Sequence, residues 1–164
     1  MEKWKQRLGV YGIYVDNKKL LVVKKTRGPY VNRFDLPGGS FDSNESIIQC
    51  LKRELKEEVG CIFSPKKMIG IFDYLIPWKI KDYTHLHHLA IYYEIDLPNK
   101  LKQRSIVADD TAGYELIDIN NLNELNSSPL IMEAVNYIKG KEQQNNIKRY
   151  DDWKVIGELV SHGV

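Results

Sequence analysis

The chain has 164 residues, of which 43% are hydrophobic and 28% are charged. These values fit one ordinary globular domain and indicate neither a disordered chain nor a membrane protein. The net charge of +2, from 24 basic and 22 acidic residues, is too small to argue for a nucleic-acid patch or for membrane binding.

The start of the chain and its cysteines bear on the compartment. Residues 1–7 are basic, but neither an uninterrupted apolar stretch nor a small-residue cleavage site follows them, as a signal peptide would require. Cys50 and Cys61 form neither a C-x-x-C pair nor a disulfide framework, so both are expected to be reduced core residues. We therefore expect a cytoplasmic protein.

The first forty residues predict strands and loops. Residues 8–15 and 19–24 are apolar, β-branched and aromatic runs, and the three residues 16–18 between them suit a tight turn, so we expect a β-hairpin. Residues 26–32 contain a Gly-Pro pair and predict a loop. The Leu-Pro-Gly-Gly run at 36–39 is expected to end a short strand.

A helix is expected over residues 47–59. Ser46 and Gln49 have the spacing of a capping box at its start, and Gly60 suits a left-handed cap at its end. Apolar residues recur at helical spacing, at Ile48, Leu51, Leu55 and Val59.

The second half predicts strands over 68–75, 86–95 and 113–117, followed by a helix over 130–138 with Pro129 in its first turn. Strands with two interspersed helices indicate an α/β (α+β) fold in which helices cover the faces of a sheet.

The C-terminal end of the chain is expected to lie outside this domain. We place the domain at 1–140 and a C-terminal extension at 141–164, which begins in a polar linker. Apolar residues between 153 and 160 suit one or two amphipathic turns. The extension is expected to dock on the domain or on the second subunit of a homodimer.

Three glutamates gather on the expected helix. Glu54, Glu57 and Glu58 stand at i, i+3 and i+4, so their carboxylates project from one face. Two such charges 4 Å apart repel by ~4 kcal/mol where the effective dielectric is about 20. A divalent cation would neutralise them, and oxygen ligands favour Mg²⁺ or Mn²⁺ over zinc. A lone E-x-x-E-E is more often a solvated acidic face.

The spacing around the glutamates favours the functional interpretation. Five residues separate Gly39 from Glu45, and seven separate Glu45 from the run Arg53-Glu54-Leu55-Lys56-Glu57-Glu58-Val59-Gly60-Cys61. This is the Nudix box, G-x5-E-x7-R-E-U-x-E-E-x-G-U with U bulky and apolar, if Cys61 is accepted as the last position. A chance match is on the order of one in ten million at average residue frequencies. The sequence therefore resembles the Nudix, or MutT-like, hydrolases.

The resemblance implies a fold and a metal site. The family fold is an α/β/α sandwich with a mixed β-sheet, in which the box forms a loop, a helix and a loop. The resemblance places the metal on Glu57 and Glu58, with help from Glu54 and the backbone carbonyl of Gly38. Glu54 acts instead as the general base in some members.

Other box residues are implied to support the site. Arg53 would orient the glutamates through an ion pair, and Glu45 would support the loop geometry. Gly38 and Gly39 would let the backbone approach the substrate phosphates without a side chain in the way. Many relatives have Glu in place of Asp42 and Gly in place of Asn44, but both positions lie outside the minimal box.

The implied activity is hydrolysis that depends on Mg²⁺ or Mn²⁺. Water would attack phosphorus in the diphosphate bond of a small molecule, a nucleoside diphosphate linked to another moiety. One alternative is a Nudix-fold sensor that binds a nucleotide without cleaving it, although such modules typically lose box glutamates. Another is an isomerase with a reactive thiol, for which Cys50 and Cys61 lack an obvious activating base.

Weaker signals leave two interpretations open. Asp109 and Asp110 are either an additional metal ligand or base, or solvated turn residues. The three histidines at 85, 87 and 88 are expected to be structural, since a strand places His88 on the face opposite the other two. The aromatic residues Tyr74, Trp78 and Tyr83 either stack on a nucleobase or, as expected for most of them, pack in the core.

Overall fold

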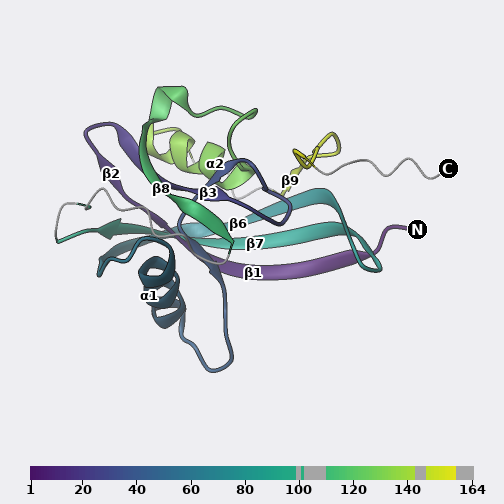
Figure 1. Ribbon diagram of the computed structural model, residues 1–164, viewed down its shortest axis with the longest axis horizontal. Coiled ribbons are helices and arrows are strands. Elements are labelled where there is room, and N and C mark those ends of the chain that lie inside the picture. The colour runs from purple at the N-terminus through teal and green to yellow at the C-terminus, as the bar shows by residue number, and fades with distance from the viewer. Residues whose placement is uncertain (99–100, 102–109, 143–146, 158–164) are drawn as a thin grey trace.

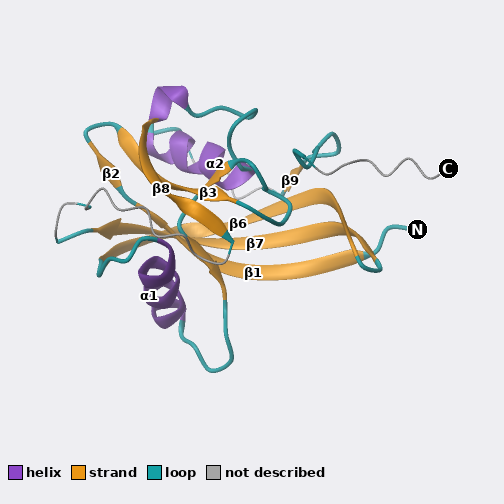
Figure 2. Cartoon of the chain, viewed as in Figure 1, coloured by secondary structure: helices purple, strands orange, loops and turns teal. Residues whose placement is uncertain are grey.

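A computed structural model describes residues 1–98, 101, 110–142 and 147–157. Two β-sheets lie between two α-helices, one on each outer side (Figure 1; Figure 2). This arrangement confirms the expected sandwich. The elements in chain order are β1 (Trp4–Ile13), β2 (Val15–Asp16), β3 (Lys19–Lys25), β4 (Phe34–Asp35), β5 (Gly38–Ser40), α1 (Ile47–Glu58), β6 (Ser64–Ile80), β7 (Tyr83–Asp96), β8 (Thr111–Asp118), the 3-10 helix η1 (Ile119–Asn121), α2 (Pro129–Ile138) and β9 (Lys148–Arg149).

The larger sheet is mixed and has the strand order β5-β1-β7-β6-β9. β1 runs parallel to β7 over its whole length, from the pair Trp4 and His85 to the pair Ile13 and Glu94. β6 and β7 form a long antiparallel hairpin. In the smaller sheet, β3 pairs with β2, β4 and β8, and all three pairings are antiparallel.

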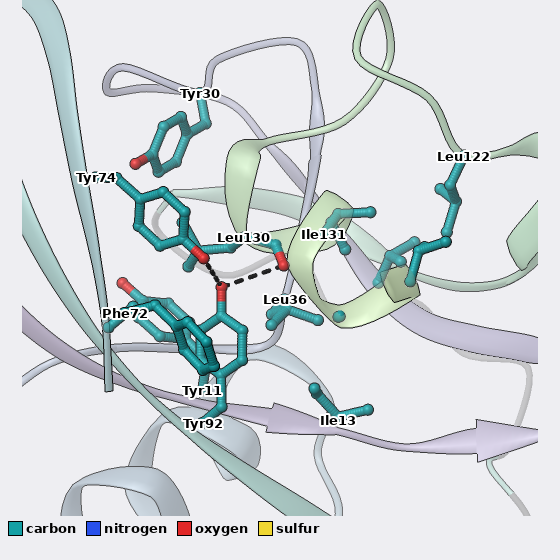
Figure 3. Close-up of a cluster of buried hydrophobic side chains, with 14 of the residues drawn as sticks. Tyr11, Ile13, Tyr30, Leu36, Phe72, Tyr74, Tyr92, Leu122, Leu130 and Ile131 are labelled. Carbon is teal, nitrogen blue, oxygen red and sulfur yellow. Dashed lines mark hydrogen bonds between the residues drawn. The ribbon is translucent and has the colours of Figure 1, made fainter. Parts of the chain in front are cut away.

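The central strands are buried on both faces, which explains their nearly continuous apolar sequences. Val10 of β1 and Leu21 of β3 point into the core under α1. Their neighbours Tyr11 and Leu20 point into the core under α2. Figure 3 shows this second core, where the Tyr92 hydroxyl donates to the Leu130 carbonyl of α2 at 3.2 Å.

The expected hairpin between 8–15 and 19–24 is wrong in its first strand. β1 ends at Ile13 and belongs to the larger sheet, and only the two residues of β2 pair with β3. Asn17 and Lys18 form the turn with φ of 48° and 64°, as a two-residue hairpin requires. An apolar run does not identify its partner strand, so the pattern could not separate the two sheets.

The expected short strand ending at 36–39 is two strands. β4 belongs to the smaller sheet and β5 to the larger one, and the segment between them crosses from sheet to sheet. Pro37 lies in this crossing, where its carbonyl accepts a bond from the Gly12 N–H at 2.9 Å. The crossing brings the glycines next to α1.

Both helices agree with expectation. Ser46 and Gln49 form the reciprocal capping box of α1, and Gly60 has a φ of 69° just beyond its end. Ser128 caps α2, with Pro129 in its first turn. In the described residues, no helix has the length and apolar character needed to cross a membrane.

The C-terminal segment differs from expectation. Residues 150–157 contain no helix, and residues 158–160 lie outside the described range. The carbonyls of Lys154 and Ile156 accept bonds from side chains of an earlier loop instead of closing helical turns. A short amphipathic pattern could not distinguish these arrangements.

Candidate active site

A cleft of about 420 Å³ lies between β5, β1, the end of β3 and α1. Its lining mixes acidic and basic side chains with backbone of the glycine segment. The lining residues are Arg7, Tyr11, Lys25, Arg27, Asp35, Gly38, Gly39, Ser40, Phe41, Asp42, Arg53, Glu54, Glu57 and Asp110.

Glu45 and Arg53 join the box loop to the box helix. Arg53 Nε and Nη2 donate to the two Glu45 oxygens at 2.6 and 3.0 Å, which is a bidentate pair. Arg53 Nη2 also donates to the Ser40 carbonyl at 3.0 Å, and Glu45 accepts from the Asp42 N–H at 2.9 Å. The hydrogen bonds from Arg53 and Asp42 lower the pKa of Glu45 to about 2. Glu45 therefore stays ionised and holds the loop.

Asn44 explains one departure from the usual pattern of the box. Its φ is 65°, in the left-handed region that glycine adopts without steric cost. Asparagine tolerates this conformation better than most other residues. Asn44 therefore keeps the turn before Glu45 that glycine makes in many relatives.

Arg53 also bridges two glutamates of α1. Its Nη1 donates to Glu54 at 2.9 Å and to Glu57 at 3.4 Å. The Glu54 side chain is 15% exposed, whereas that of Glu57 is 54% exposed. Arg53 thus contacts both carboxylates, and its role in orienting them for catalysis stays a prediction.

Glu58 is the buried member of the acidic cluster, with a side chain only 2% exposed. It accepts a hydrogen bond from the Gly38 N–H at 2.8 Å and lies 3.9 Å from Lys25 Nζ. Burial raises the pKa of Glu58 well above its ordinary value, although Lys25 and Gly38 oppose this effect. Glu58 thus connects the helix to the glycine segment.

Close packing accounts for both glycines. A Cβ on Gly38 would lie 2.1 Å from the Val10 carbonyl oxygen, and the φ of Gly38 is 140°. A Cβ on Gly39 would lie 2.5 Å from Glu54 Oε1. Gly38 lets β5 approach the backbone of β1, and Gly39 leaves room for the carboxylate of Glu54.

Lys25 at the end of β3 is a cleft residue that sequence reasoning missed. It forms ion pairs with Glu58 and Asp110. A lysine at the end of an apolar strand is ordinarily a solvated residue, so no sequence signal singled it out. Asp110 lines the cleft, while Asp109 lies outside the described residues.

Arg7, Arg27 and Asp35 were also missed. Asp35 is buried, and it accepts hydrogen bonds from Ser128 Oγ at 2.6 Å and the Leu36 N–H at 2.9 Å. Burial raises the pKa of Asp35 to about 6. Its place directly before the Leu-Pro-Gly-Gly run was the one available signal.

The donor set fits a hard divalent cation. Glu54, Glu57 and Glu58 offer only oxygen, and so does the carbonyl of Gly38. Two of these carboxylates share a single guanidinium nitrogen, and the third lies buried against a backbone N–H. Within the described part of the chain, no three histidine, cysteine or carboxylate side chains converge as a preformed metal site. A cation held here would replace contacts with Arg53 and Gly38.

The histidines have structural contacts, as expected. His88 is buried between the hydroxyls of Tyr11 and Tyr30, at 2.8 Å from each. His87 lies 2.6 Å from Asp73, and His85 bonds to the hydroxyl of Thr84. Of the three aromatic candidates for base stacking, Tyr74 and Trp78 are buried and Tyr83 is exposed.

The cysteines are poorly suited to thiol chemistry. Cys50 is buried in α1, and burial together with nearby carboxylates raises the pKa of its thiol to about 12. Burial also raises the pKa of Cys61. Since the thiolate is the reactive form, neither residue supports the isomerase alternative.

Comparison with known proteins agrees with the box. The NUDIX domain family model matches residues 5–134. An ADP-ribose pyrophosphatase of Methanocaldococcus jannaschii is 31% identical over 119 residues, which cover 72% of this chain and 65% of that protein. An 8-oxo-dGTP diphosphatase of Buchnera aphidicola is 32% identical over 99 residues, covering 53% of this chain and 76% of that protein. The chain thus spans slightly less than two thirds of the first relative.

Solved structures agree on the fold. A MutT protein from Methanosarcina mazei has a TM-score of 0.63 at 16% identity, covering 85% of this chain and 96% of that one. A NUDIX hydrolase from Nitrosomonas europaea has a TM-score of 0.59 at 23% identity, covering 92% of this chain and all of that one. With the complete box and the matching family model, the chain belongs to the NUDIX family.

Proposed function

We propose that the protein is a metal-dependent hydrolase that cleaves the diphosphate bond of a nucleoside diphosphate linked to another moiety. The observation that carries this proposal is the acidic cluster of α1, which borders a cleft whose other walls supply Arg7, Lys25 and Arg27. Carboxylates suit a cation and a water proton, and the basic residues suit the charges of a diphosphate. Relatives named for ADP-ribose and 8-oxo-dGTP support this substrate class.

Glu57 and Glu58, with Glu54 and the Gly38 carbonyl, would hold Mg²⁺ or Mn²⁺. When bound, such a cation neutralises the diphosphate, polarises phosphorus and lowers the pKa of a coordinated water. Arg53 keeps Glu54 and Glu57 on one side of the cleft through its Nη1, and Glu45 fixes Arg53 from the opposite side.

As the alternative to a role as metal ligand, Glu54 would accept the proton of the attacking water. Burial is the main cause that raises the pKa of its carboxyl, which makes it a better base than an exposed glutamate. As the water oxygen bonds to phosphorus, the bridging P–O bond breaks, and its electron pair leaves with the departing phosphate. Lys25 and Arg27 line the cleft, and their positive charges would bind the phosphate oxygens.

The test is product release from a substrate panel with Mg²⁺ and with Mn²⁺. The panel contains ADP-ribose, 8-oxo-dGTP, a dinucleoside polyphosphate, a nucleotide sugar and RNA with a 5′-triphosphate. The wild type is compared with Glu57→Gln, and with Glu142→Gln as a matched control at an exposed position after α2. We expect one preferred substrate, whose turnover is lost only in Glu57→Gln.

Two outcomes would overturn the proposal. Equal rates for wild type and Glu57→Gln would remove the acidic cluster from catalysis. A nucleotide that binds tightly but is recovered intact after long incubation with Mg²⁺ would favour the sensor alternative. Loss of activity on thiol alkylation would instead reopen a role for the cysteines.

A further inference from the structure

The C-terminal strap, residues 148–157, contacts the loop formed by residues 26–33. The Trp153 indole N–H donates to the Pro29 carbonyl at 3.0 Å. The Arg33 guanidinium stacks over the Trp153 ring at 4.0 Å and donates to the Lys154 carbonyl at 2.8 Å. Asn32 adds a hydrogen bond of 2.9 Å to the Ile156 carbonyl. The strap therefore binds the loop through four separate contacts.

The other end of the strap is anchored to the body of the domain. β9 pairs with β6 at the edge of the larger sheet, and the Tyr150 N–H donates to the Leu75 carbonyl at 2.9 Å. Lys148 forms an ion pair with the buried Glu133 of α2. Figure 1 shows β9 beside β6. A strap fixed at this end can hold the loop in place.

The loop carries cleft residues at both ends. Lys25 and Arg27 stand at its start, and Asp35 follows its end. Two backbone bonds close the loop: the Lys25 N–H donates to the Arg33 carbonyl at 3.0 Å, and the Asn32 N–H donates to the Lys25 carbonyl at 2.9 Å. These bonds tie the backbone of Lys25 to the end of the loop that the strap contacts.

A buried path also joins the strap to the cleft. Trp153 meets the Tyr30 ring edge-on, with ring centroids 5.8 Å apart. The Tyr30 hydroxyl bonds to His88 Nδ1, and His88 Nε2 bonds to the hydroxyl of Tyr11, which lines the cleft. Burial lowers the pKa of His88 well below its ordinary value, so the ring is neutral and has one donor and one acceptor. One of the two tyrosines therefore donates to the ring and the other accepts from it; Tyr11 and Tyr30 both appear in Figure 3.

Arg33 carries a charge, yet its side chain is largely buried where the loop meets the strap. It is 7% exposed, its Nε atom is buried without a hydrogen-bond partner, and desolvation lowers its pKa. In the described range no carboxylate forms an ion pair with it, so the indole and the Lys154 carbonyl are its main compensation. This geometry holds Arg33 only while the strap is docked.

We infer that the strap is a positioning element of the cleft, and that Trp153 and Arg33 set the placement of Lys25, Arg27 and Tyr11 for the diphosphate. The inference rests on the proposed function for the identity of the ligand. The strap lies beyond residues 5–134, where the family model matches, so it is a feature of this chain in addition to the matched domain.

The first test compares Trp153→Ala with Trp153→Phe, using the preferred substrate of the wild type. Trp153→Ala should raise KM about tenfold at a temperature well below its unfolding transition, less than the ~10²-fold that a 1 Å error at the reacting centre can cost. Trp153→Phe keeps a ring for Arg33 and Tyr30, so it should recover most of the loss. Arg149→Gln is the matched control, because the Arg149 side chain contacts Glu2, Asp151 and the Trp4 ring among the contacts described, and none of these belongs to the loop.

A merely structural strap would give a different result. Trp153→Ala would then lower the melting temperature and the fraction of active enzyme, and would leave KM unchanged. That outcome, or an equal rise of KM in Arg149→Gln, would overturn the inference.

Hydrogen–deuterium exchange supplies a readout that needs no substrate. Amides in residues 25–35 should exchange faster in Trp153→Ala than in the wild type or in Arg149→Gln. A wild type that turns over no compound would count against the proposed function, and this measurement would still decide the strap. Unchanged exchange in Trp153→Ala would overturn the inference whether or not the protein is an active hydrolase.

Discussion

Two polar clusters of this molecule differ in the proportion of charged side chains that they contain. The box cluster, at the helix α1, consists of Glu45, Arg53, Glu54, Glu57 and Glu58. The inner cluster, within the core under α2, consists of Tyr11, Tyr30, Asp35, Tyr74, His88, Tyr92 and Ser128. Carboxylates outnumber basic groups in the box cluster, whereas most members of the inner cluster are uncharged.

The difference follows from where each cluster lies. The box cluster lies at the surface: Glu57 is more than half exposed, and hydrogen bonds keep the pKa of Glu45 near 2, although burial raises the pKa of Glu54 and of Glu58. In the inner cluster burial lowers the pKa of His88 and raises those of Tyr11 and Tyr92, which keeps all three neutral. The comparison teaches that the excess of carboxylates in the box cluster lies beside the cleft, where an incoming cation can balance it.

The largest expected effect belongs to Glu58→Gln. The amide keeps the shape and can still accept from the Gly38 N–H, but it removes the buried charge of the box cluster. We predict that turnover falls about 10²–10⁴-fold, with a melting temperature close to that of the wild type. Steady-state rates and thermal unfolding check this. A normal rate would show that the buried charge is not needed for catalysis.

The next largest effect is on the pH dependence of the free energy of unfolding, which Asp35→Asn tests. Burial in the folded protein raises the pKa of Asp35 from 3.8 to about 6. The carboxyl therefore stays protonated to higher pH in the folded protein than in the unfolded chain. The free energy of unfolding should therefore fall, by on the order of 2–3 kcal/mol, as pH rises from about 4 to about 7.

Asp35→Asn should lack this part of the pH dependence. Urea unfolding of the metal-free protein at several pH values measures it as the difference between the two proteins. Glu45 affects stability at lower pH. Because its pKa is depressed in the folded protein, it contributes to the free energy of unfolding, and this contribution is lost as pH falls from about 4.5 toward about 2. Parallel profiles for wild type and Asp35→Asn would contradict the account of the inner cluster.

Arg53→Lys should have a smaller effect on catalysis. Lysine keeps the charge but cannot form the bidentate pair with Glu45 while also holding Glu54 and Glu57. We predict that kcat/KM falls about 10–100-fold, as for other outer-shell partners of metal ligands. Retention of full activity would mean that the guanidinium geometry does not matter. Lys52→Arg, on the exposed face of α1, is the control.

Gly39→Ala gives the smallest effect. The added Cβ would stand 2.5 Å from Glu54 Oε1, at the end of a side chain that can shift. Activity should fall roughly tenfold while the fold remains, because only the placement of one carboxylate changes. A Gly39→Ala enzyme with unaltered kinetics would argue against Glu54 as the proton acceptor.

The sequence was sufficient to predict those features of the site that depend on residues close together in the chain. The capping box of Ser46 and Gln49, the positive φ of Gly60 and the shared face of the three glutamates all depend on spacing within one helix. The bidentate pair between Glu45 and Arg53 was not predicted, because Glu45 lies in the loop before the helix.

Contacts between distant segments could not be predicted in this way. Lys25 meets Glu58 and Asp110 only because β3, α1 and the start of β8 come together. The pairing of β1 with β7, and the docking of Trp153 on the loop, also join residues far apart in the chain. Apolar pattern and turn residues carry no information about such partners.

The central claim is that the box cluster binds a divalent cation, and Mn²⁺ binding measured by electron paramagnetic resonance tests it without a substrate. We predict that the wild type and Glu142→Gln bind Mn²⁺ with equal affinity. Glu57→Gln and Glu58→Gln should each lose at least the roughly 10–100-fold typical of outer-shell changes. Equal Mn²⁺ affinity in all four proteins would contradict the claim.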